Sequence, residues 1–279
     1  MLTLILPILH SLRPLNLLLI FVFQLVIFLF GGGHGALGFT FFLTFPVLLV
    51  AAGGYLVNNF CDQKKDAFNQ KENRPKLAVK PFLFIYFGFN LLALGISLIY
   101  SIELFLVVSI VIFLLFLYAK CLSDWPLVGN FLVSLLSAFS VGIIYFFPID
   151  NNWEMSHLYF LIILIFNVSL ARELVKDCED MDGDKKAGAQ TVPISFGLNF
   201  SNILIALILF INSIFTGAWG FYFLSIGSAY FWLIVVLVSL GLAIACSIFL
   251  LKSEKKYRIL SNVLKVYMFL GVFLIPALR

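Results

Sequence analysis

Long apolar runs, separated by short polar segments, follow one another along the whole sequence. Nine of these runs come close to the roughly twenty residues that a helix needs to cross a bilayer. The expected spans are 14–32, 36–57, 81–101, 103–119, 127–147, 155–173, 198–217, 228–250 and 260–278. Most are apolar all round, as expected of helices that face lipid and one another. The pattern predicts an all-α integral membrane bundle of about nine transmembrane helices.

The composition supports a lipid environment. Of the 279 residues 62% are hydrophobic and only 11% are charged, whereas about a quarter of the residues of a soluble domain are charged. The net charge of +4 does not indicate nucleic-acid binding, because most of the chain has no water-facing basic surface. The four cysteines lack the paired spacing of a disulfide framework or a zinc site.

Lysine and arginine are unevenly distributed among the connections between the expected spans. The two long hydrophilic loops, 58–80 and 174–197, are rich in both, whereas the connections at 31–35 and 148–157 contain neither. Cytoplasmic loops of membrane proteins hold an excess of these residues. We therefore expect a multi-pass protein of the plasma or inner membrane, with the N-terminus and both long loops in the cytoplasm.

The two halves of the chain are roughly alike in organisation. Each has two apolar spans, then an acidic loop, then two more spans, which predicts a weak internal repeat. No soluble domain or linker interrupts the pattern. We therefore expect a single transmembrane domain over residues 1–279.

The first hydrophilic loop begins with polar residues at helical spacing. Asn58, Asp62 and Asp66 lie at i, i+4 and i+8, so on a helix they share one face. Two carboxylates one turn apart repel each other unless a cation lies between them. Hard oxygen ligands of this kind suit Mg²⁺, which completes its shell with water and substrate phosphate.

The second hydrophilic loop repeats this chemistry. Asp177, Asp180 and Asp184 lie at i, i+3 and i+7, with Glu173 one turn before them. Single acidic residues at a helix end are usually only solvated. Two such clusters at matching positions instead predict one cavity with a carboxylate-lined mouth and an apolar interior. This shape suits a ligand with a polyanionic head bound through metal and a hydrocarbon tail.

Further polar residues are candidates for substrate contact. They are Asn16, Arg74, Tyr118, Lys120, Asn130, Arg172 and Lys176. The cations could neutralise the charge on a departing diphosphate, and Lys120, which stands almost alone in its loop, is a catalytic candidate. The alternatives are orientation of the chain for the cations and helix–helix contact for Asn16 and Asn130.

Both acidic clusters resemble the motifs of a known family. The first reads NNFCDQKKD, with a trailing NRP, and the second reads DCEDMDGDKKAGAQTVP. They are similar to the NDxxDxxxD and DxxDxxxD motifs of the UbiA superfamily of intramembrane prenyltransferases. The RPLN opening, the YAKCLSDWPLVGN segment and the nine expected spans extend the resemblance over nearly the whole chain.

The resemblance implies a fold, a reaction and a set of residues. It implies Mg²⁺-assisted departure of diphosphate from a polyprenyl diphosphate, followed by attack of an acceptor on the allylic cation. The implied metal ligands are Asn58, Asp62, Asp66, Asp177, Asp180 and Asp184. Of these, Asp62, Asp66, Asp180 and Asp184 carry the catalytic role. The chain departs from the family pattern at Asn59, where Asp is usual, and at Lys120, which follows Tyr118 by two residues instead of four.

The second motif most resembles the branch that prenylates geranylgeranylglyceryl phosphate in ether-lipid synthesis. An aromatic prenyltransferase acting on a 4-hydroxybenzoate-type quinone precursor is the alternative, and a transporter or channel with acidic rings is a third. The expected partners are a polyprenyl diphosphate donor, a lipid-soluble or phosphorylated acceptor and membrane lipid. Neither nucleic acid nor an obligate protein partner is expected.

Overall fold

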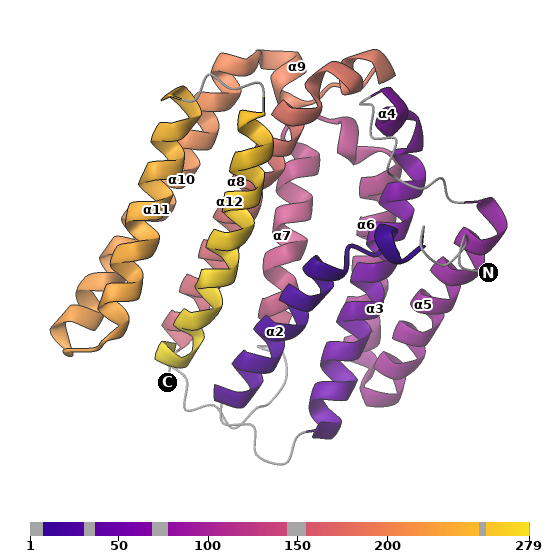
Figure 1. Ribbon diagram of the computed structural model, residues 1–279. Coiled ribbons are helices and arrows are strands. Elements are labelled where there is room, and N and C mark those ends of the chain that lie inside the picture. The colour runs from indigo at the N-terminus through magenta and orange to yellow at the C-terminus, as the bar shows by residue number, and fades with distance from the viewer. Residues whose placement is uncertain (1–7, 31–36, 69–77, 144–154, 251–254, 279) are drawn as a thin grey trace.

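The computed structural model describes residues 8–30, 37–68, 78–143, 155–250 and 255–278, and within these ranges it contains helices and no strand (Figure 1). The helices are α2 Pro14–Phe30, α3 Leu37–Cys61, α4 Gln63–Phe68, α5 Val79–Tyr100, α6 Ile102–Lys120, η1 Leu122–Asp124, α7 Val128–Gly142, α8 Met155–Ala187, α9 Val192–Phe196, α10 Leu198–Ser225, α11 Tyr230–Leu250, α12 Lys256–Gly271 and η3 Val272–Leu278. The predicted all-α fold is confirmed.

Each of the nine expected spans matches one helix. Within the described ranges, seven helices are long and apolar enough to cross a membrane. The other two matches, α2 and α7, are shorter apolar helices. The 15 residues of α7 rise only about 22 Å, less than the roughly 30 Å of a hydrocarbon core. Large apolar side chains such as Phe84, at 82% exposure, cover the outside of the bundle, as a multi-pass membrane protein requires.

The expectation of a long loop at 174–197 was wrong. Helix α8 continues without a break to Ala187, and only a short connection separates it from α9. The extension is helical because Leu174, Val175 and Cys178 are buried on one side of it, at helical spacing. The helix ends before Gly188, whose φ of +83° lies in the left-handed region that favours glycine.

The expected loop at 58–80 is also partly helical. Helix α3 runs to Cys61, and α4 follows one residue later. The backbone N–H of Asp62 donates to the carbonyl of Asn58, and that of Asp66 donates to the carbonyl of Asp62, at 2.9 Å each. These helical i→i−4 bonds keep the three motif residues in the register that their spacing predicted. Residues 69–77 lie outside the described part of the chain.

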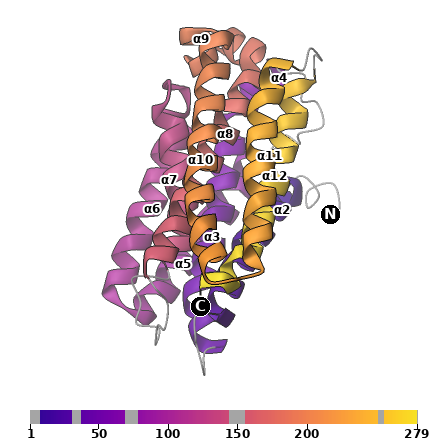
Figure 2. The ribbon, with the colours of Figure 1, turned by 90° about the vertical axis from the view of Figure 1, so that its left-hand side faces the viewer.

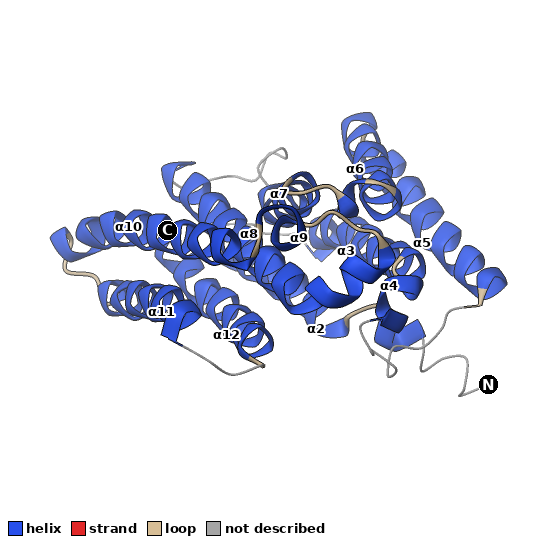
Figure 3. Ribbon diagram, turned by 90° about the horizontal axis from the view of Figure 1, so that it is seen from above, coloured by secondary structure: helices blue, strands red, loops and turns tan. Residues whose placement is uncertain are grey.

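Helix α8 lies near the middle of the bundle and organises its packing (Figure 3). It contacts α7, α10 and α12 along its length and α4 and α9 near its end. Its buried side is lined by fully enclosed apolar residues, including Leu161, Val168 and Ala171. Helix α3 packs in turn against α5 and α6. Two apolar helices, then a helix of only five or six residues, then two more apolar helices occur twice in the element order before α12, in agreement with the predicted repeat.

The short helices α4 and α9 lie at the same end of the bundle (Figures 1 and 2). Helix α4 contains the end of the first acidic segment, α9 follows the second, and α4 packs directly against α8. Segments far apart in the sequence therefore bring their polar residues to one end of the fold.

Candidate functional site

A polar cleft lies at this end of the bundle. Its walls come from α3, α4, α6, η1 and α8 together with residues just outside α2 and α9. The lining residues are Arg13, Asn58, Asp62, Lys65, Asp66, Tyr118, Ser123, Glu173, Lys176, Asp177, Asp180, Asp184 and Thr191. The cleft holds about 570 Å³ of space free of protein atoms, part of it open to solvent. The structure thus brings all six expected metal ligands to one site.

On the α3–α4 wall, Asp62 is engaged through both carboxylate oxygens. Asn58 donates through Nδ2 to Asp62 Oδ2 at 2.8 Å, and Lys65 Nζ lies 3.3 Å from Asp62 Oδ1. Lys65 also contacts Asp124 Oδ1 at the end of η1. Asn58 Oδ1 is buried and has no hydrogen-bond partner among the described residues. This amide oxygen can therefore bind a cation or accept a hydrogen bond from a ligand.

Burial and neighbouring charges set the ionisation of this pair. Burial raises the pKa of Asp62, although the ammonium of Lys65 opposes the shift. Burial alone would lower the pKa of Lys65, but its ion pairs with Asp62 and Asp124 more than offset that effect and raise the pKa. Lys65 is therefore a permanent cation in the cleft.

On the opposite wall, Asp177 is held by a residue from another helix. The buried Asn130, in the first turn of α7, donates through Nδ2 to Asp177 Oδ2 at 2.8 Å. One turn earlier on α8, Glu173 accepts from Lys176 Nζ at 2.6 Å and pairs with Arg172 Nη1 at 3.2 Å. These contacts fix the carboxylates before any ligand binds.

The cleft carries an excess of negative charge that suits metal ions. Six carboxylates and three cations line it, which leaves a formal charge of 3 − 6 = −3. Within the described residues, no group of three His, Cys, Asp or Glu side chains converges closely enough to hold a metal alone. Mg²⁺ needs only one or two carboxylates when phosphate and water complete its shell. Together with the unpartnered Asn58 Oδ1, the residues therefore fit Mg²⁺ bound jointly with a phosphate ligand.

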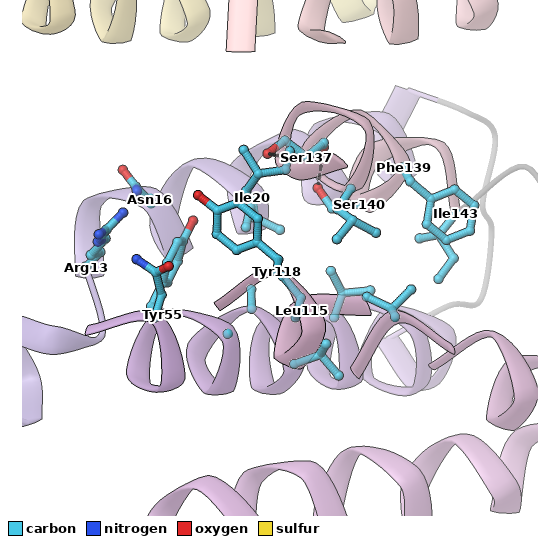
Figure 4. Close-up of a pocket in the computed structure, with 18 of the residues that line it drawn as sticks. Arg13, Asn16, Ile20, Tyr55, Leu115, Tyr118, Ser137, Phe139, Ser140 and Ile143 are labelled. Carbon is cyan, nitrogen blue, oxygen red and sulfur yellow. Dashed lines mark hydrogen bonds between the residues drawn. The ribbon is translucent and has the colours of Figure 1, made fainter. Parts of the chain in front are cut away.

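An apolar cavity adjoins the polar cleft (Figure 4). It holds about 1040 Å³ of space free of protein atoms, part of it open to solvent, and aliphatic residues of α3, α6 and α7 form most of its walls. Five residues border both spaces: Arg13, Asn58, Tyr118, Glu173 and Lys176. Arg13, Asn16 and Tyr55 lie at one end, whereas Phe139 and Ile143 lie at the other (Figure 4). The two spaces together fit a ligand with an anionic head and a long apolar tail.

The other expected site residues fall into different positions. Asn16, Tyr118 and Arg172 line the apolar cavity. Asn130 lines neither space and instead supports Asp177 from behind. Arg74 lies outside the described residues. Asn59 is buried and donates to Ser11 Oγ at 2.7 Å, so the residue that replaces the usual Asp ties α3 to the N-terminal segment and does not line the cleft.

Lys120 is not brought into the cleft. Its side chain is exposed, and Nζ lies 5.8 Å from the centre of the Phe116 ring, one turn back on α6. Residues i and i+2 of a helix point to different sides. Because Tyr118 faces the cleft, Lys120 faces away from it.

Several lining residues were not among the sequence-based candidates, notably Arg13, Lys65 and Thr191. Arg13 lies in the RPLN segment and Lys65 within the first acidic motif, so both were signalled only by their place in a motif. Arg13 has a φ of +50°, which is uncommon outside glycine, and its guanidinium lies 5.3 Å from the centre of the Tyr55 ring. Such backbone strain is often found at functional sites.

Known proteins share both the sequence pattern and the fold. Residues 17–272 match the UbiA prenyltransferase family. The digeranylgeranylglyceryl phosphate synthase of Sulfolobus acidocaldarius is 36% identical over 174 residues, which is 61% of this chain and 62% of that protein, so the match spans less than two thirds of this relative.

Two solved structures have similar folds. A structure from work on digeranylgeranylglyceryl phosphate synthase in membranes superposes with a TM-score of 0.73 at 22% identity, over 100% of this chain and 99% of that one. A UbiA homologue from Archaeoglobus fulgidus, bound to GPP and Mg²⁺, superposes with a TM-score of 0.62 at 17% identity, over 96% of this chain and 99% of that one. Since the family match covers nearly all of the helical bundle and both acidic segments, this chain belongs to the UbiA prenyltransferase family.

Proposed function

We propose that this prenyltransferase moves a geranylgeranyl group from its diphosphate to the glycerol hydroxyl of a geranylgeranylglyceryl phosphate acceptor. The observation that carries the proposal is that the polar cleft and the apolar cavity adjoin and share lining residues. A cleft lined by six carboxylates opens into an apolar cavity, with Arg13, Asn58 and Lys176 at the junction. This arrangement supports a donor whose diphosphate lies in the cleft and whose tail lies in the cavity.

We assign the metal-holding role to residues on both walls of the cleft. They are Asn58, Asp62, Asp66, Asp177, Asp180 and Asp184. Bound Mg²⁺ would neutralise the phosphate oxygens and favour departure of the diphosphate. Arg13 and Lys176 add positive charge where the departing group lies. The C1–O bond of the donor breaks with its electron pair on the diphosphate, and a new C1–O ether bond forms as the acceptor hydroxyl releases its proton.

The walls of the apolar cavity have a separate task. Aliphatic residues such as Val108 and Leu115 enclose the allylic part of the donor. They exclude water that would otherwise capture the cation. The aromatic ring of Tyr118, at the junction with the cleft, supplies a π-face next to the position of developing positive charge.

The charges at the junction favour a phosphorylated acceptor. Three cations, Arg13, Arg172 and Lys176, border the apolar cavity together with one acid, Glu173. Arg172 Nε is buried without a hydrogen-bond partner among the described residues. With the same diphosphate donor, a phosphorylated acceptor needs more cations around it than an aromatic acid acceptor does. The name of the Sulfolobus relative agrees with this choice.

The topology completes the proposal. Lys and Arg concentrate at the end of the bundle that holds α4 and α9, so we propose that this end faces the cytoplasm of a cell-membrane protein. Because the cleft takes residues from Arg13 to Thr191 and α8 also packs against α10 and α12, we propose residues 1–279 as one domain.

Diphosphate release by purified protein tests the proposal. Geranylgeranyl diphosphate is supplied with Mg²⁺ and, in separate reactions, with geranylgeranylglyceryl phosphate or 4-hydroxybenzoate. Release that requires Mg²⁺ and the glyceryl phosphate supports the proposal. Release with 4-hydroxybenzoate alone would identify an aromatic prenyltransferase instead. Ion flux in liposomes without any release would favour a channel or transporter.

A further inference from the structure

Lys65 lies between two carboxylates from different parts of the fold. Its Nζ is 3.3 Å from Asp62 Oδ1 on the cleft wall and also contacts Asp124 Oδ1 in η1. The side chains of Lys65 and Asp62 are each only 19% exposed, whereas that of Asp124 is 42% exposed. Asp124 is not one of the residues that line the cleft. One ammonium is thus shared between a carboxylate in the cleft and a carboxylate at its rim.

The pairing of Asp62 conflicts with its proposed role as a metal ligand. Both of its oxygens are engaged, Oδ2 by Asn58 and Oδ1 by Lys65. A cation that binds Asp62 would come close to the Lys65 ammonium, and the two positive charges would repel each other. The Asn58 bond brings no such conflict, because the same side chain offers its unpartnered Oδ1 to a cation. Lys65 is therefore the partner that has to move.

Asp124 is placed to receive it. The Asp124 backbone carbonyl accepts from the N–H of Gln190 at 3.1 Å, and Ser123 Oγ lies 3.3 Å from Asp124 Oδ1. The Gln190 contact joins η1 to the segment after α8, whereas the Ser123 contact lies within η1 itself. Because Lys65 already contacts Asp124, it keeps a carboxylate partner when it leaves Asp62.

We propose that Lys65 is an exchangeable counter-ion, which neutralises Asp62 when the cleft holds no divalent cation and pairs with Asp124 alone when one is bound. The inference rests on the metal–diphosphate site of the proposed function. Asp124 then acts as a positioning residue, since it sets the affinity for the divalent cation only through Lys65. The exchange also keeps Asp62 from being an uncompensated buried charge before substrate arrives.

Binding of Mn²⁺, followed by electron paramagnetic resonance, tests the exchange without relying on turnover. Full-length protein in detergent is titrated in the presence of the unreactive thiolo analogue of geranylgeranyl diphosphate. Asp124→Asn confines Lys65 to Asp62 and is expected to weaken Mn²⁺ binding about two- to fivefold, the range of a partly exposed ion pair. Lys65→Met removes the competing cation and is expected to tighten binding by a similar factor.

The double variant carries the decisive comparison. If Asp124 acts through Lys65, Asp124→Asn has no effect on Mn²⁺ affinity in the Lys65→Met background. Two exposed residues at the end of α8, neither lining the cleft, provide matched controls: Asp182→Asn and Lys186→Met change charge equally and are expected to leave the affinity unchanged. Circular dichroism confirms that each variant is folded.

Each other outcome overturns the exchange. If Asp124→Asn weakened Mn²⁺ binding equally with Lys65 present and in the Lys65→Met background, the effect would be that of a long-range charge. If it weakened Mn²⁺ binding in neither background, Asp124 would have no role. If the unmodified protein binds Mn²⁺ normally and the variants match it, only this inference fails. If the unmodified protein binds no Mn²⁺ with the analogue present, the metal site of the proposed function fails as well.

Discussion

Replacing Asn130 with alanine should raise the Mg²⁺ concentration needed for half-maximal activity. The amide of Asn130 is buried and makes a 2.8 Å hydrogen bond to Asp177 Oδ2. A hydrogen bond to a charged group contributes about 1.5–3 kcal/mol. At 1.4 kcal/mol for each factor of ten, complete loss of this bond corresponds to a roughly 10- to 150-fold increase in the Mg²⁺ concentration for half-maximal activity. Water that enters the space left by the amide offsets part of this, so we expect the lower end, about tenfold.

Diphosphate release, measured against Mg²⁺ concentration with saturating donor, gives the comparison directly. Ser134→Ala is the matched control, because Ser134 lies one turn along α7, is also buried and donates to the backbone carbonyl of Asn130 at 2.6 Å. It removes a buried hydroxyl without touching Asp177. Its Mg²⁺ dependence should stay close to that of the unmodified protein.

The reasoning would be refuted if Asn130→Ala folded normally and kept the original Mg²⁺ dependence. A second test uses the coupling between the two residues. In an Asp177→Asn background, which already lacks the charge that Asn130 supports, Asn130→Ala should raise the Mg²⁺ requirement far less than it does alone. Additive effects would mean that Asn130 acts by packing α7 and not through Asp177.

Further expectations follow from the same cavities. Asp62→Ala and Asp180→Ala should each abolish diphosphate release while expression is retained, because a metal ligand is lost from a bundle that lipid still supports; normal activity in both would remove them from the site. EDTA should stop turnover and added Mg²⁺ should restore it, and turnover that persists in EDTA would argue against a metal site. Ile143→Trp should slow transfer from geranylgeranyl diphosphate more than from geranyl diphosphate, because Ile143 lies at the end of the apolar cavity far from Arg13; equal slowing would place the tail elsewhere.

The membrane helices could be predicted because lipid imposes one rule on every span. A segment in lipid satisfies its backbone as a helix and shows apolar residues all round, so each apolar run located the described helix that matches it. The rule stops at the membrane surface. In the α8 extension the buried apolar residues Leu174, Val175 and Cys178 lie among acidic residues such as Asp177 and Asp180. The helical period was present there, but the density of charge favoured a loop.

The acidic half of the cleft could be predicted for a similar local reason. Spacings of three and four residues place side chains on one face wherever the helix lies. Lys65 and Asp124 are 59 positions apart in sequence, and only the fold brings these residues of α4 and η1 into contact. The same holds for Asn130 and Asp177, which come from adjacent helices and are 47 positions apart in sequence. Spacing along the chain carries no signal for either pair.

The cations were the hardest residues to assign because two physical demands draw them to the same end of the bundle. Orientation in the membrane requires Lys and Arg on the cytoplasmic side, and in the orientation proposed above, neutralisation of phosphate in the cleft requires them on that same side. The sequence cannot separate the two demands, but side-chain position can. Arg13 and Lys176 border both the cleft and the cavity, whereas Lys120 is exposed on the outside of α6. The position of a cation in the fold, and not its nearness to a motif, therefore distinguishes a candidate for substrate binding, which borders the cleft and the cavity, from a cation that lies away from both.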